Sequence, residues 1–526
     1  MRFDTVIVGC GTTGSMLAAY LSQDPSRTVC AIEAGRDYPT AAELPRGVRA
    51  LVSLPPGTVT RSMVAATTDD DSIGYPDWGL TARSTGLQPD IHLPRGKLVG
   101  GSSAVNGCTW LWPAREDLDA WAKAGNQSWG YNDCLPYLAS LERDLDHPRA
   151  PHGTAGPIPV QRPRREDWAP LSEAFYRACL DLGFGDCPDF NAPDSWGAGP
   201  IPKNYDDPDG TGERVRYSTA VGYLMPARGR PNLSVIAGTT ATRLVLDGGA
   251  ARGVEVILDG QPTLIEAGEV LLTAGAIGSP QLLMLSGIGP AGHLRALGIE
   301  PLVDLPGVGQ NLRDHPVLCA SWSATAVPPV PGTELSVQVA LRATTPGSAD
   351  GHDMQLMSYR DEGPGRFGLP FSLMHAESAG QLRLASADPL AEPRTDFRHL
   401  EEASDRARMR AMVRLMDEIV HRMDAAGSRA QGRLRPERIT PDPAGTSSDS
   451  ELDEWMLRNV ITGHHICGTC KMGVPGDPAA VVDETGRVHG AENLRVVDAS
   501  IMVDCPRSNI NATVMMIAEK LAASIG

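Results

Sequence analysis

Two adjacent histidines and two nearby cysteines form a dense group of reactive side chains in the C-terminal part of the sequence. A short segment, residues 462–473, contains His464, His465, Cys467 and Cys470. A neutral imidazole, whose pKa lies near ~6.5, can accept a proton from a hydroxyl group. The same residue types could bind a metal ion, and the Cys-x-x-Cys spacing is that of a redox dithiol. General base, metal ligand and dithiol are the three chemistries to separate.

A tetrahedral metal site built from these four residues would need His465 as a ligand and would remove it from proton transfer. No second Cys-x-x-Cys and no spaced histidine pair accompanies them, so we expect no metal. A dithiol of Cys467 and Cys470 that passes electrons to a cofactor stays open as an alternative. For Cys467 we favour a packing role and for His464 a structural role, in which its ring bonds to the backbone.

The elements that must position this group begin with a nucleotide-binding pattern at the N-terminus. Apolar residues 5–8 predict a strand, the glycines after it predict a tight turn, and residues 15–22 predict a helix. A second apolar run, residues 28–32, predicts another strand that ends at Glu33. This order is typical of the first unit of a dinucleotide-binding fold.

Each glycine of this turn has its own physical role. Gly9 permits the tight turn, Gly11 lets backbone amides approach a pyrophosphate, and Gly14 permits close packing of helix on strand. Glu33 follows Gly14 by 19 residues, where a carboxylate can accept hydrogen bonds from a ribose diol. The pattern predicts a dinucleotide but does not distinguish NAD from FAD.

Composition excludes several classes of protein. The 526 residues carry 47 Lys and Arg against 64 Asp and Glu, a formal charge of -17, which disfavours nucleic-acid binding. The apolar stretch 270–290 contains several glycines and prolines, so we expect a buried loop and helix rather than a membrane span. The N-terminus lacks the pattern of a signal peptide, and ten cysteines are thinly spread. A reduced, cytoplasmic setting is the expectation.

Three further segments extend the nucleotide pattern along the whole chain. They are the small-residue stretch 95–107, the Gly- and Ser-rich stretch 275–289, and the C-terminal pair 498–500 and 509–512. Together they resemble the glucose-methanol-choline (GMC) flavoprotein oxidoreductases, from residue 5 to residue 525. The resemblance implies an FAD-dependent enzyme that oxidises a primary or secondary alcohol to the carbonyl.

The resemblance also implies an α/β fold in which a discontinuous Rossmann-like FAD-binding domain carries a second, α+β domain. Alternating runs between residues 317 and 394 predict that the second domain is built on a largely antiparallel sheet. We predict that residues 1–150, 213–314 and 460–526 form the FAD-binding domain. Residues 151–212 and 315–459 would form the substrate-binding domain.

In the family a histidine three residues before a Gly-Thr pair takes the alcohol proton, and His465 has that position. Asn509, 44 residues later, matches the second catalytic residue. Hydride would pass to flavin N5. The resemblance and the glycine turn together predict these cofactor-binding residues: Gly9, Gly11, Thr12, Thr13, Gly14, Glu33, Ala34, Val99, Ser103, Asn106, Gly107, Ala241, Asp498 and Asn511.

Other features of the expected enzyme stay open or depend on single residues. Some relatives attach flavin covalently through a histidine, where this sequence has Val105, so we expect non-covalent FAD. The electron acceptor would be dioxygen, a quinone or another carrier, and Gly463 is small where some oxidases have valine. A non-redox lyase that retains FAD, a flavin thiol oxidase and an FAD-free binding protein are the competing classes.

The substrate pocket is expected between residues 317 and 380. Candidates for its wall are Met357, Tyr359, Phe367, Phe371 and His375. The helical spacing of methionines within residues 401–423 indicates a core face rather than a partner groove.

Overall fold

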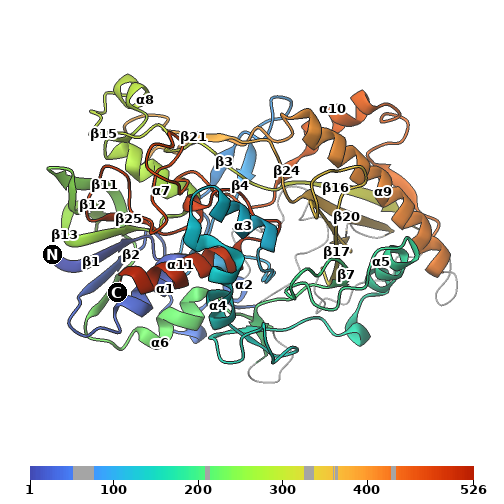
Figure 1. Cartoon of the computed structure of the whole chain (residues 1–526), viewed down its shortest axis with the longest axis horizontal. Helices are drawn as coiled ribbons and strands as arrows, with labels where there is room; N and C mark the ends of the chain where they lie inside the picture. Colours follow the sequence, from blue (N-terminus) through green and yellow to red (C-terminus); the bar gives the residue numbers. More distant parts are fainter. Residues whose placement is uncertain are drawn as a thin grey trace.

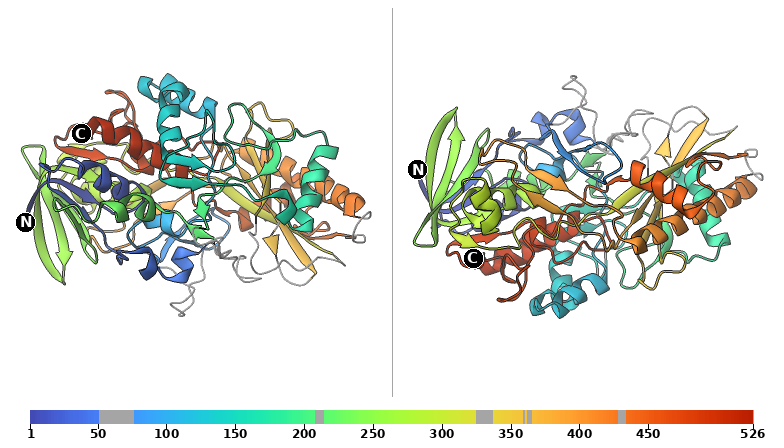
Figure 2. Two further views of the ribbon diagram at one scale, coloured as in Figure 1. Left: turned by 90° about the horizontal axis from the view of Figure 1, so that it is seen from below. Right: turned by 90° about the horizontal axis from the view of Figure 1, so that it is seen from above.

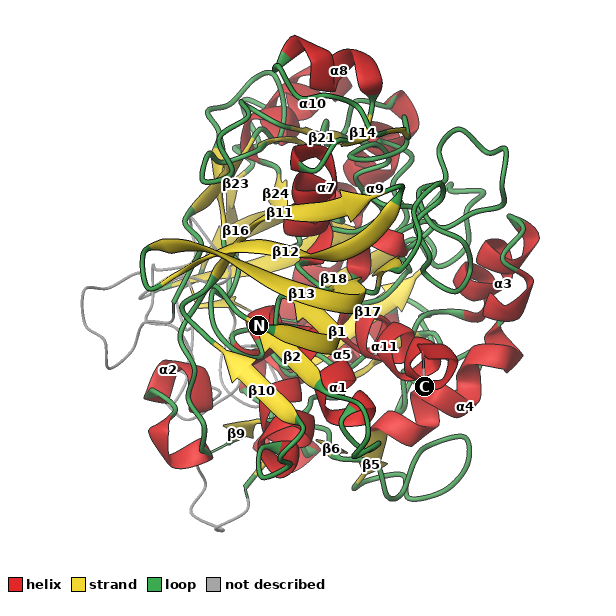
Figure 3. Cartoon of the chain, turned by 90° about the vertical axis from the view of Figure 1, so that its left-hand side faces the viewer, coloured by secondary structure: helices red, strands yellow, loops and turns green. Residues whose placement is uncertain are grey.

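The computed structural model describes residues 1–50, 76–207, 214–324, 337–358, 360–361, 365–427 and 434–525. Two large sheets organise these residues, one toward each end of an elongated molecule (Figures 1 and 2). Both chain termini lie on the side of the first sheet (Figure 1). Seen from that side, the second sheet lies behind the first (Figure 3).

The first sheet is the nucleotide-type sheet that the N-terminal pattern predicts. Its strand order is β10-β2-β1-β13-β12-β11, with β25 beside β13. The central pairs are parallel, and β11 and β12 are antiparallel additions at one edge. The strands are β1 Arg2–Val8, β2 Val29–Ile32, β10 Leu233–Ile236, β11 Thr240–Asp247, β12 Ala250–Leu258, β13 Gln261–Leu272 and β25 Leu494–Val496. Parallel strands are buried on both faces, which explains why β2 and the second half of β1 are apolar and buried.

Helices from both ends of the chain pack together on this sheet. Helix α1 (Thr12–Leu21) follows β1, and the C-terminal helix α11 (Asn511–Ile525) packs against α1 and α4 (Tyr131–Leu141). The apolar stretch 270–290 forms the end of β13 and helix α7 (Gly275–Leu285), as expected. Among the described helices, none has both the length and the apolar character that crossing a membrane requires.

The second sheet is antiparallel throughout its described pairs, as predicted. Its order is β23-β16-β20-β18-β17-β7, with β19 on β20 and β24 on β16. Helices α5 (Pro170–Asp181) and α9 (Ala403–Gly427) pack on each other and cover one face (Figure 1). The strands are β7 Gly197–Pro200, β16 Pro316–Ser323, β17 Val339–Ala343, β18 Met354–Met357, β19 Arg360–Asp361, β20 Arg366–Leu373, β23 Glu437–Thr440 and β24 Ile461–Thr462.

The remaining elements connect or flank the two sheets. They are η1 Ala41–Glu43, α2 Arg46–Arg49, β3 Leu80–Ala82, β4 Ile91–Leu93, η3 Gly101–Ala104, α3 Arg115–Lys123, η4 Gln127–Trp129, β5 Glu142–Asp144, β6 Ile158–Val160, η5 Arg165–Asp167, β8 Tyr205–Asp206, β9 Val215–Arg216, η6 Ala220–Leu224, α6 Met225–Ala227, β14 Ile288–Gly289, α8 Ala291–Ala296, β15 Val303–Asp304, β21 Gln381–Arg383, β22 Arg394–Asp396, α10 Asp449–Asn459 and η7 Ala499–Ile501.

The core between the second sheet and its helices corrects two of the pocket-wall predictions. Phe367 and Phe371 are fully buried in this core, with the methionines of α9. They therefore cannot line a pocket on the opposite face of the sheet. Met357 lies outside this core, at the strand parity of the opposite face, and Tyr359 lies outside the described residues. The predicted core role of the α9 methionines is confirmed by their burial.

The hydrophobic cores divide the chain much as the sequence patterns suggest. One core surrounds the first sheet, and another joins the second sheet to α5, α9 and α10. Leu382, Leu384 and Phe397 pack into the first core, although they lie in a range predicted for the substrate-binding domain. The domain boundaries stay predictions.

Candidate active site

Strand β24 places His464 and His465, which follow it, at the edge of the second sheet. It pairs with the start of β16, in the register Pro316 with Thr462. The residues just beyond this pairing, His315 on one strand and Gly463 to His465 on the other, are therefore neighbours. The Gly463 N–H donates to the His315 carbonyl at 2.8 Å.

The structure brings together the two predicted catalytic side chains. His465 Nε2 lies 3.0 Å from Asn509 Nδ2. The other ring nitrogen, Nδ1, lies 2.8 Å from Nδ1 of His315, and the two rings meet edge to face with centroids 4.9 Å apart. Sequence reasoning missed His315. Its only signal was its place directly before an apolar run that predicts a strand.

Asp314, also missed, fixes the backbone of the histidine segment. Its carboxylate accepts the N–H of His465 at 2.8 Å and that of Gly463 at 3.2 Å, and it lies 3.3 Å from His399 Nε2. Burial alone would raise the pKa of Asp314, but hydrogen bonds from His399 and Thr462 hold it well below its usual value. A charged carboxylate thus orients the segment that carries His465.

Both histidines of the contacting pair are neutral. Burial lowers the pKa of His315 to about 4. Burial, together with the neighbouring His315, lowers the pKa of His465 well below its ordinary value of 6.5. A neutral imidazole with a low pKa offers a lone pair on one ring nitrogen and an N–H on the other. His465 can therefore accept a proton without first losing one.

The expectation for His464 is wrong. Neither ring nitrogen hydrogen-bonds to the backbone or to any other group within the described residues. Its main chain, in contrast, is hydrogen-bonded, since the His464 carbonyl accepts from Arg95 Nη2 at 2.8 Å. The residue has φ 64, in the left-handed region that few residues other than glycine adopt.

The cysteines have different partners from those that the Cys-x-x-Cys spacing suggests. Cys467 is fully buried beside Cys505, whereas the Cys470 N–H donates to the Ser500 carbonyl at 2.8 Å. Burial raises the pKa of Cys470 and of Cys505 well above the usual value of a thiol. All ten cysteines are free thiols. These contacts support a packing role for Cys467.

The glycine turn is tight and leaves no room for side chains at Gly9 and Gly14. Gly9 has φ 96, and a Cβ at Gly14 would lie 2.0 Å from the Gly9 carbonyl oxygen. The turn opens helix α1, whose first N–H groups point toward the turn. Thr13 Oγ1 is buried there without a hydrogen-bond partner in the described parts of the chain.

Glu33 lies beside this turn, at the end of β2. Its carboxylate accepts the N–H of Cys10 at 3.1 Å and that of Gly35 at 2.8 Å. Burial raises the pKa of Glu33 to about 7. Each carboxylate oxygen keeps a second lone pair for a ribose hydroxyl. The backbone just before Ala241 bonds to Glu33 and Gly35, so Ala34 and Ala241 lie in the same neighbourhood.

The small-residue loop predicted to contact the cofactor lies against the glycine turn. The N–H of Gly100, next to Val99, donates to the Cys10 carbonyl at 2.8 Å. Ser103 Oγ donates to the Gly100 carbonyl at 2.7 Å. Farther along, Asn106 Oδ1 accepts from the Cys108 N–H at 3.0 Å, and Gly107 is exposed.

The two C-terminal cofactor candidates differ in how they are held. Asp498 is buried, and its carboxylate accepts from the Gly275 N–H, from Ser279 and from Ser500. Its side chain therefore mainly braces the start of α7 and η7. Asn511 begins α11, and its Nδ2 is buried with no partner among the described residues.

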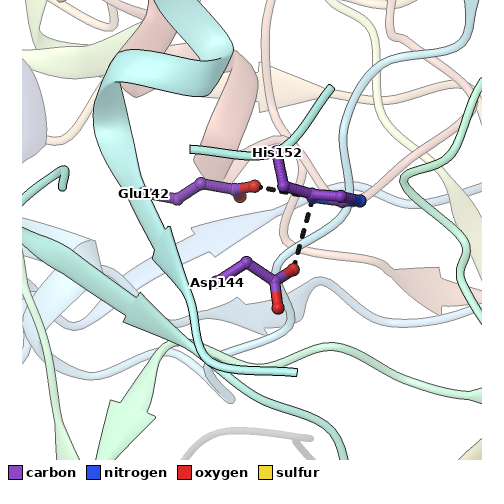
Figure 4. Close-up of side chains that lie close together, drawn as sticks. All are labelled: Glu142, Asp144 and His152. Atoms are coloured by element: carbon purple, nitrogen blue, oxygen red, sulfur yellow. Dashed lines mark hydrogen bonds and ion pairs between the residues drawn. The ribbon is translucent and has the colours of Figure 1, made fainter. Parts of the chain in front are cut away.

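A second group of ionisable side chains has the residue types of a metal site. Glu142, Asp144 and His152 point toward one another (Figure 4). Both ring nitrogens of His152 are already bonded at 2.8 Å, to Glu142 and to Asp189, and Arg162 Nη1 bonds both oxygens of Asp144 at 3.0 Å. His152 and Arg162 already pair with these carboxylates, so the group is an ion network rather than a cation site.

The sequence of the chain matches two family models and several known proteins. Two family models, both described as GMC oxidoreductase, match residues 3–317 and 376–518. The chain is 36% identical to an uncharacterized GMC-type oxidoreductase in the thcA 5′ region of Rhodococcus erythropolis, over 99% of this chain and 97% of the relative. It is 33% identical to an oxygen-dependent choline dehydrogenase of Brucella anthropi, over 100% of this chain and 96% of the relative.

A solved structure supports the same relationship. Pyridoxine 4-oxidase from Mesorbium loti superposes with a TM-score of 0.87 at 30% identity, and the alignment covers 99% of each chain.

Proposed function

Because the chain belongs to the GMC oxidoreductase family, we propose that it oxidises a primary or secondary alcohol to the carbonyl. FAD would be its cofactor, and His465 would be the general base. The observation that carries the proposal is the contact of His465 Nε2 with the Asn509 amide at 3.0 Å. Two of the similar proteins are named for alcohols, choline and pyridoxine, which supports an alcohol as substrate.

The residues that would hold FAD fit that cofactor. The Gly9–Gly14 turn would bind the pyrophosphate, Glu33 the adenosine ribose, and the segment around Asn511 the pyrimidine side of the flavin. The buried, unpaired Thr13 Oγ1 and Asn511 Nδ2, both noted among the described residues, are suitable donors for such a ligand. When bound, FAD supplies the acceptor for the hydride at flavin N5.

The side chains of the protein itself would accept the proton that the alcohol loses. His465 would take the hydroxyl proton of the alcohol at Nε2, and the Asn509 amide would hold the oxygen as negative charge develops on it. Asp314 keeps the His465 backbone in place through a 2.8 Å hydrogen bond. His464, whose ring nitrogens have no partner within the described chain, would line the pocket.

The mode of FAD attachment and the electron acceptor belong to the same proposal. Val105, in the loop where some relatives carry a covalent histidine link, cannot form such a bond, so we expect FAD to be released by denaturation. Dioxygen, or a quinone or another carrier, would reoxidise the enzyme. Oxygen consumption during turnover distinguishes these acceptors.

The test is anaerobic reduction of the purified flavoprotein by a panel of benzylic, furanic, aliphatic, sugar and amino alcohols. One or more alcohols should bleach the flavin absorbance of the wild-type enzyme. The His465→Gln variant should bleach about 10²–10⁴-fold more slowly, because its amide is a far weaker base. Cys467→Ser is the matched control and should bleach at the wild-type rate.

Each competing function predicts a different result. Loss of bleaching in Cys467→Ser but not in His465→Gln would favour a flavin thiol oxidase. A yellow protein that no alcohol bleaches would favour a lyase, and a colourless one an FAD-free binding protein.

A further inference from the structure

A chain of hydrogen bonds runs from the backbone, through two histidines, to the Asn509 amide. The Pro506 carbonyl oxygen lies 2.9 Å from His315 Nε2. His315 Nδ1 lies 2.8 Å from His465 Nδ1, and His465 Nε2 lies 3.0 Å from Asn509 Nδ2. Each contact is within normal hydrogen-bond distance, so each pair must contain one donor and one acceptor.

The Pro506 carbonyl fixes the direction of the first hydrogen bond in this series. A carbonyl oxygen only accepts, so His315 Nε2 carries the proton and donates to Pro506. The thiol of Cys505 lies 3.2 Å from the same nitrogen, and its sulfur can share that N–H as a weak acceptor. Burial lowers the pKa of His315 to about 4, so the ring is neutral and has a single N–H. Its Nδ1 is therefore an acceptor.

The second bond then has only one direction. A lone pair on His315 Nδ1 requires a proton on His465 Nδ1, because two lone pairs at 2.8 Å would repel each other. His465 is neutral as well, so its Nε2 carries the lone pair. The Asn509 amide agrees with this assignment, since its Nδ2 donates to Nε2, while its Oδ1 has no partner among the described residues.

We propose that His315 is a positioning residue that holds His465 in the tautomer whose Nε2 carries the lone pair that accepts the substrate proton. This inference rests on the proposed role of His465 as general base. His315 does not touch the substrate; it acts through the ring of His465, as the third member of a catalytic triad orients its histidine. The lone pair on His315 Nδ1 also stabilises the imidazolium that forms when His465 takes the proton.

The surroundings keep the two rings in this arrangement. His315 is 1% exposed, and it directly follows Asp314, whose carboxylate binds the backbone of the segment that carries His465. No competing carboxylate bonds to the ring of His315 in the described part of the chain. A carboxylate there would favour the charged form and remove the tautomeric constraint.

The test combines a spectroscopic and a kinetic measurement on the FAD-loaded enzyme. With histidine labelled by ¹⁵N in the ring, the signals that disappear in His465→Gln identify His465. In the wild type, its Nε2 should give the signal of an unprotonated ring nitrogen and its Nδ1 that of a protonated one. In His315→Leu, which lacks the acceptor, the two tautomers should mix.

Anaerobic flavin reduction supplies the kinetic readout. His315→Leu should lower the reduction rate on the order of 10²-fold, less than the ~10⁴-fold effect of trapping a wrong tautomer, with KM and FAD content little changed. His315→Asn keeps an oxygen acceptor near the position of Nδ1 and should restore most of the rate. His293→Asn, at a histidine that accepts the Leu384 N–H at 3.2 Å, is the matched control and should behave as wild type.

Separate outcomes overturn the inference and the proposed function. A wild-type ¹⁵N spectrum with the proton on His465 Nε2, or an unchanged rate and spectrum in His315→Leu, would overturn the role of His315. Should His315→Leu not fold, a wild-type tautomer ratio in His315→Gln, whose amide group lies beyond the position of Nδ1, would also overturn it. A normal reduction rate in His465→Gln would instead contradict the proposed base, whatever the His315 variants show.

Discussion

Gly463 occupies a position in the candidate site that has no room for a side chain. A Cβ there would lie 2.8 Å from the His315 carbonyl oxygen and 3.2 Å from His465 Nδ1. The first distance is shorter than real Cβ contacts, and the obstacle is backbone that cannot rotate away. The missing side chain lets the two histidine rings meet.

We therefore predict that Gly463→Ala slows anaerobic flavin reduction by about tenfold or more, because the methyl group displaces His465 Nδ1 from His315. A shift of ~1 Å in a catalytic group can cost up to 10²-fold in rate. Gly229→Ala, at an exposed glycine with open space around it, should leave the rate unchanged. Equal rates in both variants and the wild type would show that the histidine contact does not control reduction.

The sequence predicted His465 and Asn509, whose side chains meet in the structure, because both lie in segments with recognisable neighbours. It did not identify His315 and Asp314. Their roles depend on the pairing of β16 with β24, which joins residues almost 150 positions apart. No local pattern encodes that pairing. That the His464 ring finds no hydrogen-bond partner among the described residues likewise follows from tertiary placement alone.

The strands of the second sheet show how a correct element prediction can still give a wrong side-chain assignment. Alternating runs between residues 317 and 394 predicted an antiparallel sheet, and β20 is one of its strands. Alternation defines two faces but not which of them meets the helices. That choice depends on α5 and α9, so Phe367 and Phe371 were assigned to the wrong face.

Phe371→Ala should destabilise the protein without changing how it binds substrate. Removing a fully buried phenylalanine from this core should cost about 3–5 kcal/mol in the free energy of unfolding, measured by denaturant titration. KM for the best alcohol should stay within about twofold of wild type at a temperature where the variant is folded. Met357→Ala, on the opposite face, should raise KM, and the reverse pattern would contradict the assignment of faces.

The first sheet, in contrast, was predictable almost strand by strand at its parallel core. A buried apolar run, a glycine turn and a helix of small and apolar residues carry their own local signals, as β1, α1 and β2 show. The packing of α11 on α1 was foreseeable only because parallel-type elements occur at both ends of the chain. The β21–β22 hairpin gave no sign that its side chains join the first core.

Across the whole molecule, the buried ion network of Figure 4 connects regions that belong to different cores. Glu142 and Asp144 form β5, next to the first core, whereas Asp189 precedes β7 of the second sheet. His152 lies between them with a side chain only 2% exposed. Burial alone would lower the pKa of His152, but hydrogen bonds to Asp189 and Glu142 raise it to about 9.

This network predicts a pH dependence of stability. Because the folded pKa of His152 exceeds its ordinary value of 6.5, the charged ring stabilises the fold fully below about pH 6.5. That contribution should fall as the pH rises through about 9, by up to roughly 3 kcal/mol. Urea unfolding at pH 6.5 and pH 9.5 should show that the difference between wild type and His152→Gln shrinks at the higher pH.

The control is His421→Gln, a histidine outside the network, which should follow the wild type at both pH values. A wild-type advantage over His152→Gln that stays constant or grows between pH 6.5 and pH 9.5 would contradict the charged state of His152.

In the proposed function, His465 and Asn509 contact the hydroxyl group of an alcohol that lies beside the flavin. The most direct measurement is a crystal structure of this chain with FAD and a non-reactive alcohol analogue. We predict that the analogue's hydroxyl lies about 2.6–3.2 Å from His465 Nε2, with its carbon about 3–3.5 Å from flavin N5. An isoalloxazine bound beyond the reach of both side chains, or a metal ion held by His465, would contradict the proposed roles of His465 and Asn509.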